Sequence, residues 1–114
     1  MIPQNNAKIK ILKEESIVYN GNTRNFYKDL DGKRNVTGEN INYYRVKKDI
    51  SAQQLSDRLI MRGIDLHRQS IYLIEAGKRT VADYELAAIA EELDVTPNDL
   101  LSTYTKYLKE EKNS

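Results

Sequence analysis

Residues 50–79 read ISAQQLSDRLIMRGIDLHRQSIYLIEAGKR and predict two short helices joined by a turn. Ser51 is a typical N-cap for the first helix, because its hydroxyl can accept a hydrogen bond from a backbone N–H in the first turn. Leu55 and Leu59 then lie one turn apart on the same face. Gly63 can adopt the left-handed backbone conformation that commonly ends a helix. The first helix is therefore expected between this serine and this glycine.

The second helix of the pair is expected over about residues 68–76, closed by Gly77. It is too short to be stable alone in water, so packing through Ile71 and Ile74 must hold it in place. With those two side chains inward, the opposite face carries two pairs of residues, each pair one turn apart: Arg68, Gln69, Tyr72 and Leu73. Two alternatives stay open, in which Leu73 belongs to the core or the polar residues are simply solvated.

Three further helices are expected, and the five together predict an all-α domain over residues 37–114. One helix covers about residues 38–48, with Thr37 as its N-cap. Another covers about residues 82–93, and the last begins at Thr96, a capping residue that is followed by proline at the first helical position. No segment of this domain alternates between apolar and polar residues with the period of a strand.

Residues 1–36 are less regular, and neither helical nor strand periodicity prevails in them. We treat them as an N-terminal arm of uncertain order, which includes the option of partial disorder. Three aromatic side chains of the arm fit a segment that becomes ordered on a protein partner: Tyr19, Phe26 and Tyr27.

The inventory of residues excludes several kinds of functional site. The chain has 114 residues, no cysteine and one histidine, which rules out disulfide scaffolds, thiol nucleophiles and zinc sites built from cysteine and histidine. The sequence also lacks a glycine-rich phosphate loop and a nucleophile beside a plausible base. We therefore expect no enzyme, metal or cofactor. Because the start of the chain has no long apolar run, a cytoplasmic protein without a membrane segment is the default expectation.

The charges separate along the chain although the net charge is only +1. Residues 1–40 carry a net charge of +2, residues 41–79 carry eight basic and four acidic side chains, and residues 80–114 carry three basic and eight acidic ones. One part of the fold should therefore attract phosphates while another repels them, so a protein of this charge can still dock on DNA in one orientation.

Residues 50–79 resemble the helix-turn-helix of the lambda-repressor/Cro superfamily, often called the xenobiotic-response-element family. The likeness extends from about Gly38 to Leu101. The start of the first helix of the pair is similar in Ser51 and Gln53-Gln54-Leu55-Ser56. The second helix and the residues after it are similar from Ile71 to Arg79. The rest of the likeness is a closing pattern: Tyr84-Glu85-Leu86, Ile89-Ala90, Leu93, Val95-Thr96 and Leu100-Leu101. The resemblance implies a five-helix, lambda-repressor-like domain that binds double-stranded DNA, with the helix at 68–76 in the major groove.

The outward face of that helix has the chemistry for reading bases, because arginine can pair with guanine, glutamine with adenine, and apolar groups with thymine methyls. The resemblance adds four phosphate-contacting residues around it, Ser51, Gln53, Lys78 and Arg79, and the place of His67 at the start of this helix makes it a fifth candidate. It also implies a buried ion pair between Arg45 and Glu75 that fixes the reading helix to the first helix. The alternatives are an exposed, weak ion pair and a solvated basic loop at residues 78–79.

Two features depart from the usual pattern of the family. Ala52 stands where the family usually has a glutamine that contacts phosphate, so that contact is absent or moved to Gln53. The turn from Ile60 to Ser70 is several residues longer than the common form, although a subset of bacterial members with a similar Gly-Ile-Asp segment shares its length. Because of the longer turn, His67 is the residue that directly precedes the reading helix. It either contacts a phosphate, which its protonated form would bind more strongly, or is solvated.

Two hypotheses for the function follow. The first is a sequence-specific transcriptional regulator, repressor-like, that binds a two-fold operator as a homodimer. Its dimer surface would lie on the last helix, although the same side chains can instead complete a monomeric core: Tyr104, Tyr107 and Leu108. The second hypothesis is an antitoxin-like or adaptor module that binds a protein through residues 1–36, with DNA binding secondary or lost.

Overall fold

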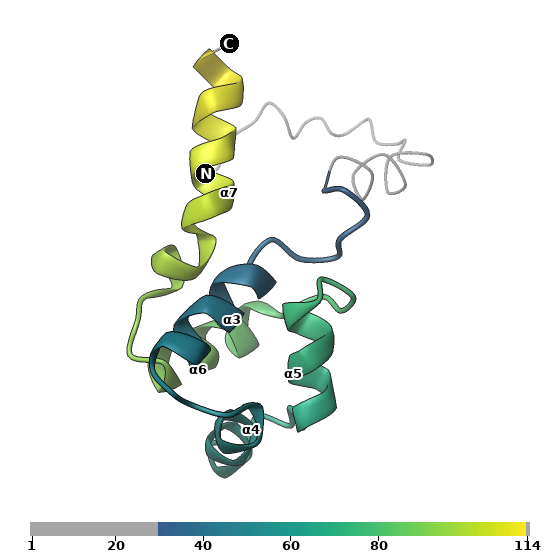
Figure 1. Ribbon diagram of the computed structural model, residues 1–114, viewed down its shortest axis with the longest axis vertical. Coiled ribbons are helices and arrows are strands. Elements are labelled where there is room, and N and C mark those ends of the chain that lie inside the picture. Colours follow the sequence, from purple (N-terminus) through teal and green to yellow (C-terminus); the bar gives the residue numbers. More distant parts are fainter. Residues whose placement is uncertain (1–29, 114) are drawn as a thin grey trace. The chain divides into compact units, whose positions relative to one another are not determined.

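The computed structural model describes residues 30–113, with side chains as far as Glu110. The regular secondary structure of these residues consists of α-helices joined by turns and loops. Five helices follow one another in the order α3 (Gly38–Lys47), α4 (Ala52–Met61), α5 (Arg68–Glu75), α6 (Asp83–Glu92) and α7 (Pro97–Asn113), as Figure 1 shows. Residues 30–113 contain no strand. The predicted fold class and the five predicted helices are therefore confirmed, to within one or two residues at their ends.

The compact unit that contains these helices begins at Lys33. Most of the predicted N-terminal arm, including Tyr19, Phe26 and Tyr27, lies outside the described residues. The protein-binding role predicted for the arm therefore stays a prediction. In the part of the chain that the structure describes, no helix is both long enough and apolar enough to cross a bilayer.

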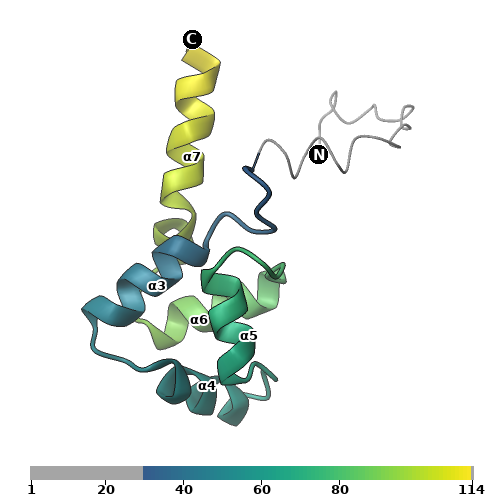
Figure 2. The ribbon, with the colours of Figure 1, turned by 45° about the vertical axis from the view of Figure 1, so that its right-hand side comes forward.

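The five helices enclose one apolar core. Helix α5 packs against α3 and α4, α4 also packs against α6, and α7 packs against α3 and α6. Figure 2 shows α5 above α4 and to the right of α3. The buried apolar side chains come from all five helices and from the turn between α4 and α5: Ile41, Ala52, Leu55, Leu59, Leu66, Ile71, Ile74, Ile89, Ala90, Leu93 and Leu100. The apolar spacings read from the sequence for α4 and α5 therefore face this core.

The first turns of α4 and α7 are closed by reciprocal hydrogen bonds. Ser51 Oγ accepts from the backbone N–H of Gln54 at 3.0 Å, and Gln54 Oε1 accepts from the Ser51 N–H at 2.8 Å. Thr96 and Asp99 repeat the arrangement at the start of α7, at 3.0 and 2.8 Å. The hydrogen bonds from the Thr96 backbone and side chain lower the pKa of Asp99. The caps predicted at Ser51 and Thr96 are thus confirmed.

Thr37 occupies the N-cap position of α3, as predicted, but its side chain does not supply the cap. Thr37 precedes the helix, but its backbone angles, φ −113° and ψ −12°, are not the extended ones that aim a capping hydroxyl at the first turn, and its side chain makes no capping hydrogen bond. Asn35 performs that role, because its Oδ1 accepts from the backbone N–H of Thr37 at 3.1 Å and of Gly38 at 2.7 Å. The Thr37 hydroxyl is buried without a hydrogen-bond partner among the described residues.

The long turn between α4 and α5 is anchored rather than loose. Gly63 takes a left-handed conformation with φ +86° just after α4, as predicted. Leu66 is fully buried, and its carbonyl accepts a hydrogen bond of 2.8 Å from the buried Ser56 hydroxyl. These contacts fix the place at which the chain turns, so that His67 directly precedes α5.

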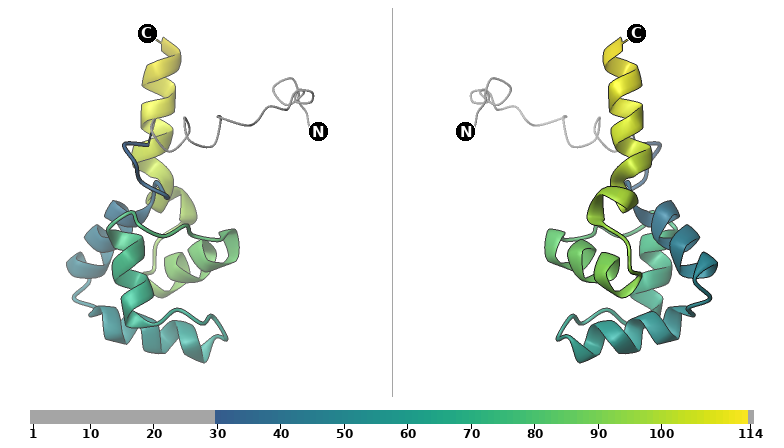
Figure 3. Two further views of the ribbon diagram at one scale, coloured as in Figure 1. Left: turned by 90° about the vertical axis from the view of Figure 1, so that its right-hand side faces the viewer. Right: turned by 90° about the vertical axis from the view of Figure 1, so that its left-hand side faces the viewer.

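Helix α7 has two parts with different surroundings. Leu100 near its start is fully buried, and the carbonyl of Leu100 accepts a hydrogen bond of 2.9 Å from Asn40 of α3. Tyr107 and Leu108 further along are each 47% exposed. The two views in Figure 3 show this later part standing clear of the other four helices. Tyr104 is half-buried and its ring stacks on Tyr107, with centroids 5.9 Å apart, so Tyr107 and Leu108 do not complete the monomeric core.

Gly38 allows α3 and α5 to approach closely. A Cβ atom at Gly38 would lie 2.1 Å from the carbonyl oxygen of Ile74, a backbone atom that cannot rotate away. We expect Gly38→Ala to lower the free energy of unfolding by about 3 kcal/mol, at the upper end of the usual cost of overpacking. Urea denaturation measures it. Glu39→Ala removes an exposed side chain from the same turn and should cost less than about 1 kcal/mol; equal losses for the two variants would contradict the close approach.

Candidate nucleic-acid interface

The two faces of α5 differ sharply in burial. Ile71 is 1% exposed and Ile74 is fully buried, whereas Tyr72 is 50% and Leu73 45% exposed. Arg68 and Gln69 in the first turn are also exposed. The alternative in which Leu73 belongs to the core is therefore wrong, and the four residues predicted to read bases share the solvent-facing side of one helix.

The side chains of Arg68 and Gln69 are available for an external ligand. Neither makes a hydrogen bond or an ion pair with any side chain or backbone group in the described part of the chain. An exposed arginine and glutamine beside a tyrosine and a leucine combine hydrogen-bond donors with apolar surface, which is the combination that base edges in the major groove require. Their contact with DNA stays a prediction.

His67 precedes α5 with extended backbone angles, but its side chain does not cap the helix. Its Nε2 lies 2.8 Å from Oδ1 of Asp65, and both side chains are exposed. A phosphate at His67 would have to compete with this neighbouring carboxylate. The predicted phosphate contact at His67 is therefore less favourable in this conformation than the sequence alone suggested.

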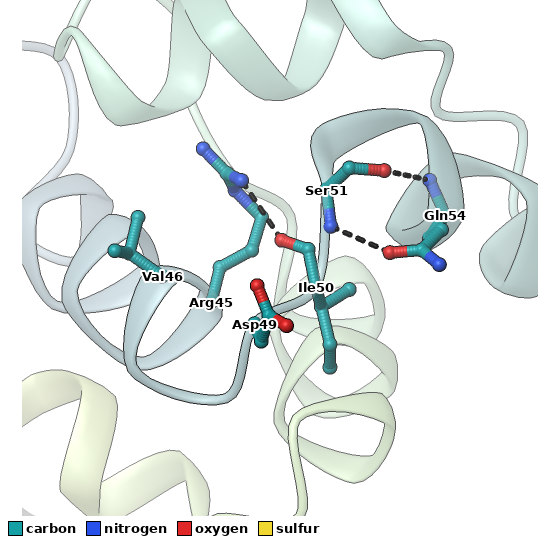
Figure 4. Close-up of a pocket in the computed structure, with 6 residues that line it drawn as sticks. All are labelled: Arg45, Val46, Asp49, Ile50, Ser51 and Gln54. Carbon is teal, nitrogen blue, oxygen red and sulfur yellow. Dashed lines mark hydrogen bonds between the residues drawn. The ribbon is translucent and has the colours of Figure 1, made fainter.

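The start of α4 presents a shallow hollow of about 400 Å³, drawn in Figure 4 and lined by Arg45, Val46, Asp49, Ile50, Ser51 and Gln54. The Ser51 hydroxyl and N–H are both engaged with Gln54 in the capping arrangement. Gln53 is exposed and donates to Asp57 one turn later, at 2.9 Å. The first-turn N–H of the exposed Gln53 has no helical carbonyl to bond, so it is a donor that this end of α4 can offer an anion, whereas Ala52 is buried.

Lys78 and Arg79 were predicted together, but the structure gives them different surroundings. Lys78 is exposed, and its side chain has no hydrogen-bond or ion-pair partner among the described residues, whereas its backbone N–H donates to the Leu73 carbonyl at 2.8 Å. Arg79 is half-buried and donates to both carboxylate oxygens of Glu85, at 3.1 and 3.3 Å. Lys78 is thus the free cation at the exit of α5, whereas Arg79 is held by α6.

The carboxylate of Glu85 is kept ionised by its partners. Burial opposes its charge, but hydrogen bonds from Arg79 and from the Ala82 backbone N–H outweigh that effect and lower the pKa of Glu85. The same carboxylate therefore caps α6 and holds the arginine that follows α5.

Arg45 and Glu75 form an ion pair that joins three elements. Arg45 Nε lies 2.6 Å from Glu75 Oε2 and Nη2 lies 3.0 Å from Oε1, while Nη1 donates to the Ile50 carbonyl at 2.9 Å. The two side chains are only 11% and 8% exposed. The hydrogen bond to Glu75 raises the pKa of Arg45 despite its burial. The pair ties the end of α5 to α3 and to the start of α4, and it is buried, in contrast to the exposed pair that was the alternative.

Three polar residues that support α5 were missed by sequence reasoning. Asn42 donates to Glu75 Oε1 at 3.0 Å, Asn35 contacts the backbone at the end of α5, and Ser56 holds the turn before it. The asparagines are more than 30 residues from their partners along the chain, so no local pattern reveals the contacts. Ser56 alone gave a weak signal, because it falls on the apolar face of α4.

Comparison with known protein families gave one finding that decides the class of this interface. The family model described as the Cro/C1-type helix-turn-helix DNA-binding domain matches residues 40–106. The chain belongs to this family. Its members are defined by a DNA-binding domain and not by an enzymatic activity, and the match confirms the predicted lambda-repressor-like fold. Comparisons with curated proteins and with solved structures returned no significant match.

The ion pair should contribute strongly to stability. Removing one partner of a buried pair leaves an uncompensated charge, so Glu75→Ala is expected to lower the free energy of unfolding by about 3–5 kcal/mol. Glu92→Ala is a matched control, because it breaks the more exposed pair with Arg62 and should cost about 1 kcal/mol or less. Chemical denaturation of both variants measures the difference. A Glu75→Ala variant no less stable than the control would show that the pair is energetically negligible.

Proposed function

We propose that the protein is a sequence-specific transcriptional regulator, repressor-like, that places α5 in the major groove of double-stranded DNA. The observation that carries the proposal is the division of α5 between two buried isoleucines and four exposed residues that can read bases. The membership of a DNA-binding family supports the same conclusion.

The base-reading residues have distinct roles in this proposal. Arg68, in the first turn of α5, donates two hydrogen bonds to the O6 and N7 atoms of a guanine, and Gln69 pairs with an adenine edge. Tyr72 and Leu73 lie one turn further along, where they contact thymine methyl groups and exclude water. These residues determine which sequence is bound.

Phosphate contacts surround α5 on two sides. Lys78 binds a phosphate near the exit of the helix, and the N–H groups at the start of α4, beside Ser51 and Gln53, bind another. Arg79 contributes less than Lys78, because binding a phosphate would weaken its ion pair with Glu85. The acidic residues of the segment 80–114 oppose binding in other orientations.

We also propose that the protein binds a two-fold operator as a homodimer, with half-sites about one helical turn of DNA apart. The exposed side chains of Tyr107 and Leu108 on the later part of α7 supply the apolar surface of the dimer. A second copy of the same helix would cover these side chains, which water otherwise surrounds.

Substitutions on α5 and after it should have different effects on binding. Arg68→Ala is expected to weaken binding to a duplex selected from random sequence by about 1–3 kcal/mol and to relax the base preference at one position. Lys78→Gln should weaken binding to all duplexes and lower the slope of log K against log salt by about 0.9. Fluorescence anisotropy at several salt concentrations measures both effects.

Lys106→Gln is the control for charge, because this exposed lysine lies on α7 away from α5. It should leave affinity and salt dependence unchanged. A wild-type protein that selects no sequence, or an Arg68→Ala variant with unaltered preference, would refute the proposed reading role of α5.

The proposed dimer surface makes a separate prediction. Leu108→Glu places two like charges against each other in a symmetric dimer, so the variant should be monomeric. Its molar mass, measured by size-exclusion chromatography with light scattering, should fall from twice 13.2 kDa to that of one chain. The helical content should not change, because Leu108 lies outside the core. Lys106→Gln should remain dimeric. A wild-type protein that is monomeric at high concentration would refute the symmetric operator as well.

A further inference from the structure

The side chain of Asn35 connects the start of α3 to the end of α5. Its Nδ2 donates to the carbonyl of Ile74 at 2.9 Å and to the carbonyl of Arg79 at 2.8 Å. Its Oδ1 accepts from the backbone N–H groups of Thr37 and Gly38. Both N–H donors and both acceptor positions of the amide are therefore used, which is all that an asparagine side chain can offer.

Two neighbouring contacts reinforce this connection. The backbone N–H of Arg34 donates to the carbonyl of Gly77 at 2.8 Å. Gly77 has φ +77°, and a Cβ there would lie 2.9 Å from the side chain of Lys33, so the two residues are in close contact. Residues 33–38 thus contact the last turn of α5 and the residues that follow it, up to Arg79, and we refer to them as the N-terminal clamp.

The clamp adds contacts from another segment to the end of α5. The last turn is closed by backbone N–H groups just after the helix, since those of Ala76, Lys78 and Gly77 donate to the carbonyls of residues 72, 73 and 74. These bonds are local, so they do not fix where the end of α5 lies relative to α3. The Arg45–Glu75 pair holds the side of α5 that faces α3, but it acts on a side chain. Asn35 holds the backbone itself, at Ile74 within the helix and at Arg79 beyond Lys78.

We propose that Asn35 is a positioning residue for base recognition, although it lies outside the helix-turn-helix and touches no base. It sets the position of α5 and of the following loop relative to α3, and hence the position of Arg68, Gln69 and Lys78 on the DNA. Paired hydrogen bonds to a base edge tolerate little displacement, whereas phosphate contacts tolerate more. Loss of Asn35 therefore lowers sequence preference more than it lowers general affinity for DNA. The inference depends on the function proposed above.

The chain offers a matched control for the test. Asn40 also links α3 to a distant backbone carbonyl, that of Leu100, and to the hydroxyl of Thr103. It contacts α7 and not α5. Asn35→Ala and Asn40→Ala thus remove similar polar links between helices, but only the first link reaches the reading helix.

The experiment compares the full-length wild type with both variants, using a duplex selected by the wild type and a random duplex of equal length. Asn35→Ala is expected to lose about tenfold in affinity for the selected duplex, the amount of one impaired base contact, and less than about twofold for the random one. Asn40→Ala should preserve the ratio of the two affinities. Circular dichroism and thermal melting verify that each variant is folded at the assay temperature.

A second variant keeps the test valid if Asn35→Ala does not fold. Asn35→Asp retains the acceptor for the start of α3 but replaces the donor to Ile74 and Arg79, so it too should lose sequence preference. An unchanged affinity ratio in a folded Asn35→Ala or Asn35→Asp variant would overturn the inference and leave the proposed function intact. A wild type that binds both duplexes equally would overturn the proposed function and this inference together.

Discussion

An eight-residue helix cannot sustain itself in water, so the face of α5 that we propose for base reading depends on contacts that hold the helix from outside. The isoleucine pair, Ile71 and Ile74, provides the apolar part of that support, because both side chains are buried in the core. Two isoleucines spaced by three residues also determine which side of the helix remains in solvent. The burial of these residues and the exposure of Arg68 and Gln69 are consequences of the same packing.

Apolar packing alone leaves the orientation of a short helix loosely defined, and directional polar contacts restrict it further. The guanidinium of Arg45 meets the Glu75 carboxylate through two hydrogen bonds in a largely buried setting. A buried charge that loses its partner is costly, so α5 cannot turn away without breaking this pair. Asn35 restricts the backbone at the end of α5 through its hydrogen bond to the Ile74 carbonyl. The helix is thus fixed both through the side chain of Glu75 and through its main chain.

The arrangement explains how a nearly neutral protein can bind a polyanion. The basic excess falls within residues 41–79, which include α4 and α5, and the acidic excess falls within residues 80–114. Two of the acidic side chains form ion pairs within the fold, Glu85 with Arg79 and Glu92 with Arg62. These pairs remove two arginines from the set available to phosphates. The cationic contribution next to α5 therefore comes mainly from Arg68 and Lys78, which are exposed.

The sequence by itself determined the five helices, the buried faces of α4 and α5, the outward position of Arg68, Gln69 and Tyr72, and the caps at Ser51 and Thr96, because helical periodicity and capping depend on residues within four positions of one another. It also suggested the ion pair between Arg45 and Glu75, through resemblance to a family. Only the tertiary structure decided that Asn35 and not Thr37 caps α3, that Arg79 is held by Glu85, and that Leu73 is exposed while Tyr107 and Leu108 stand outside the core. The contacts of Asn35 and Arg79 are close in sequence but lie in the turns before α3 and after α5, where helical periodicity gives no prediction. The exposure of Leu73, Tyr107 and Leu108 depends on where the neighbouring helices lie, which no local pattern encodes.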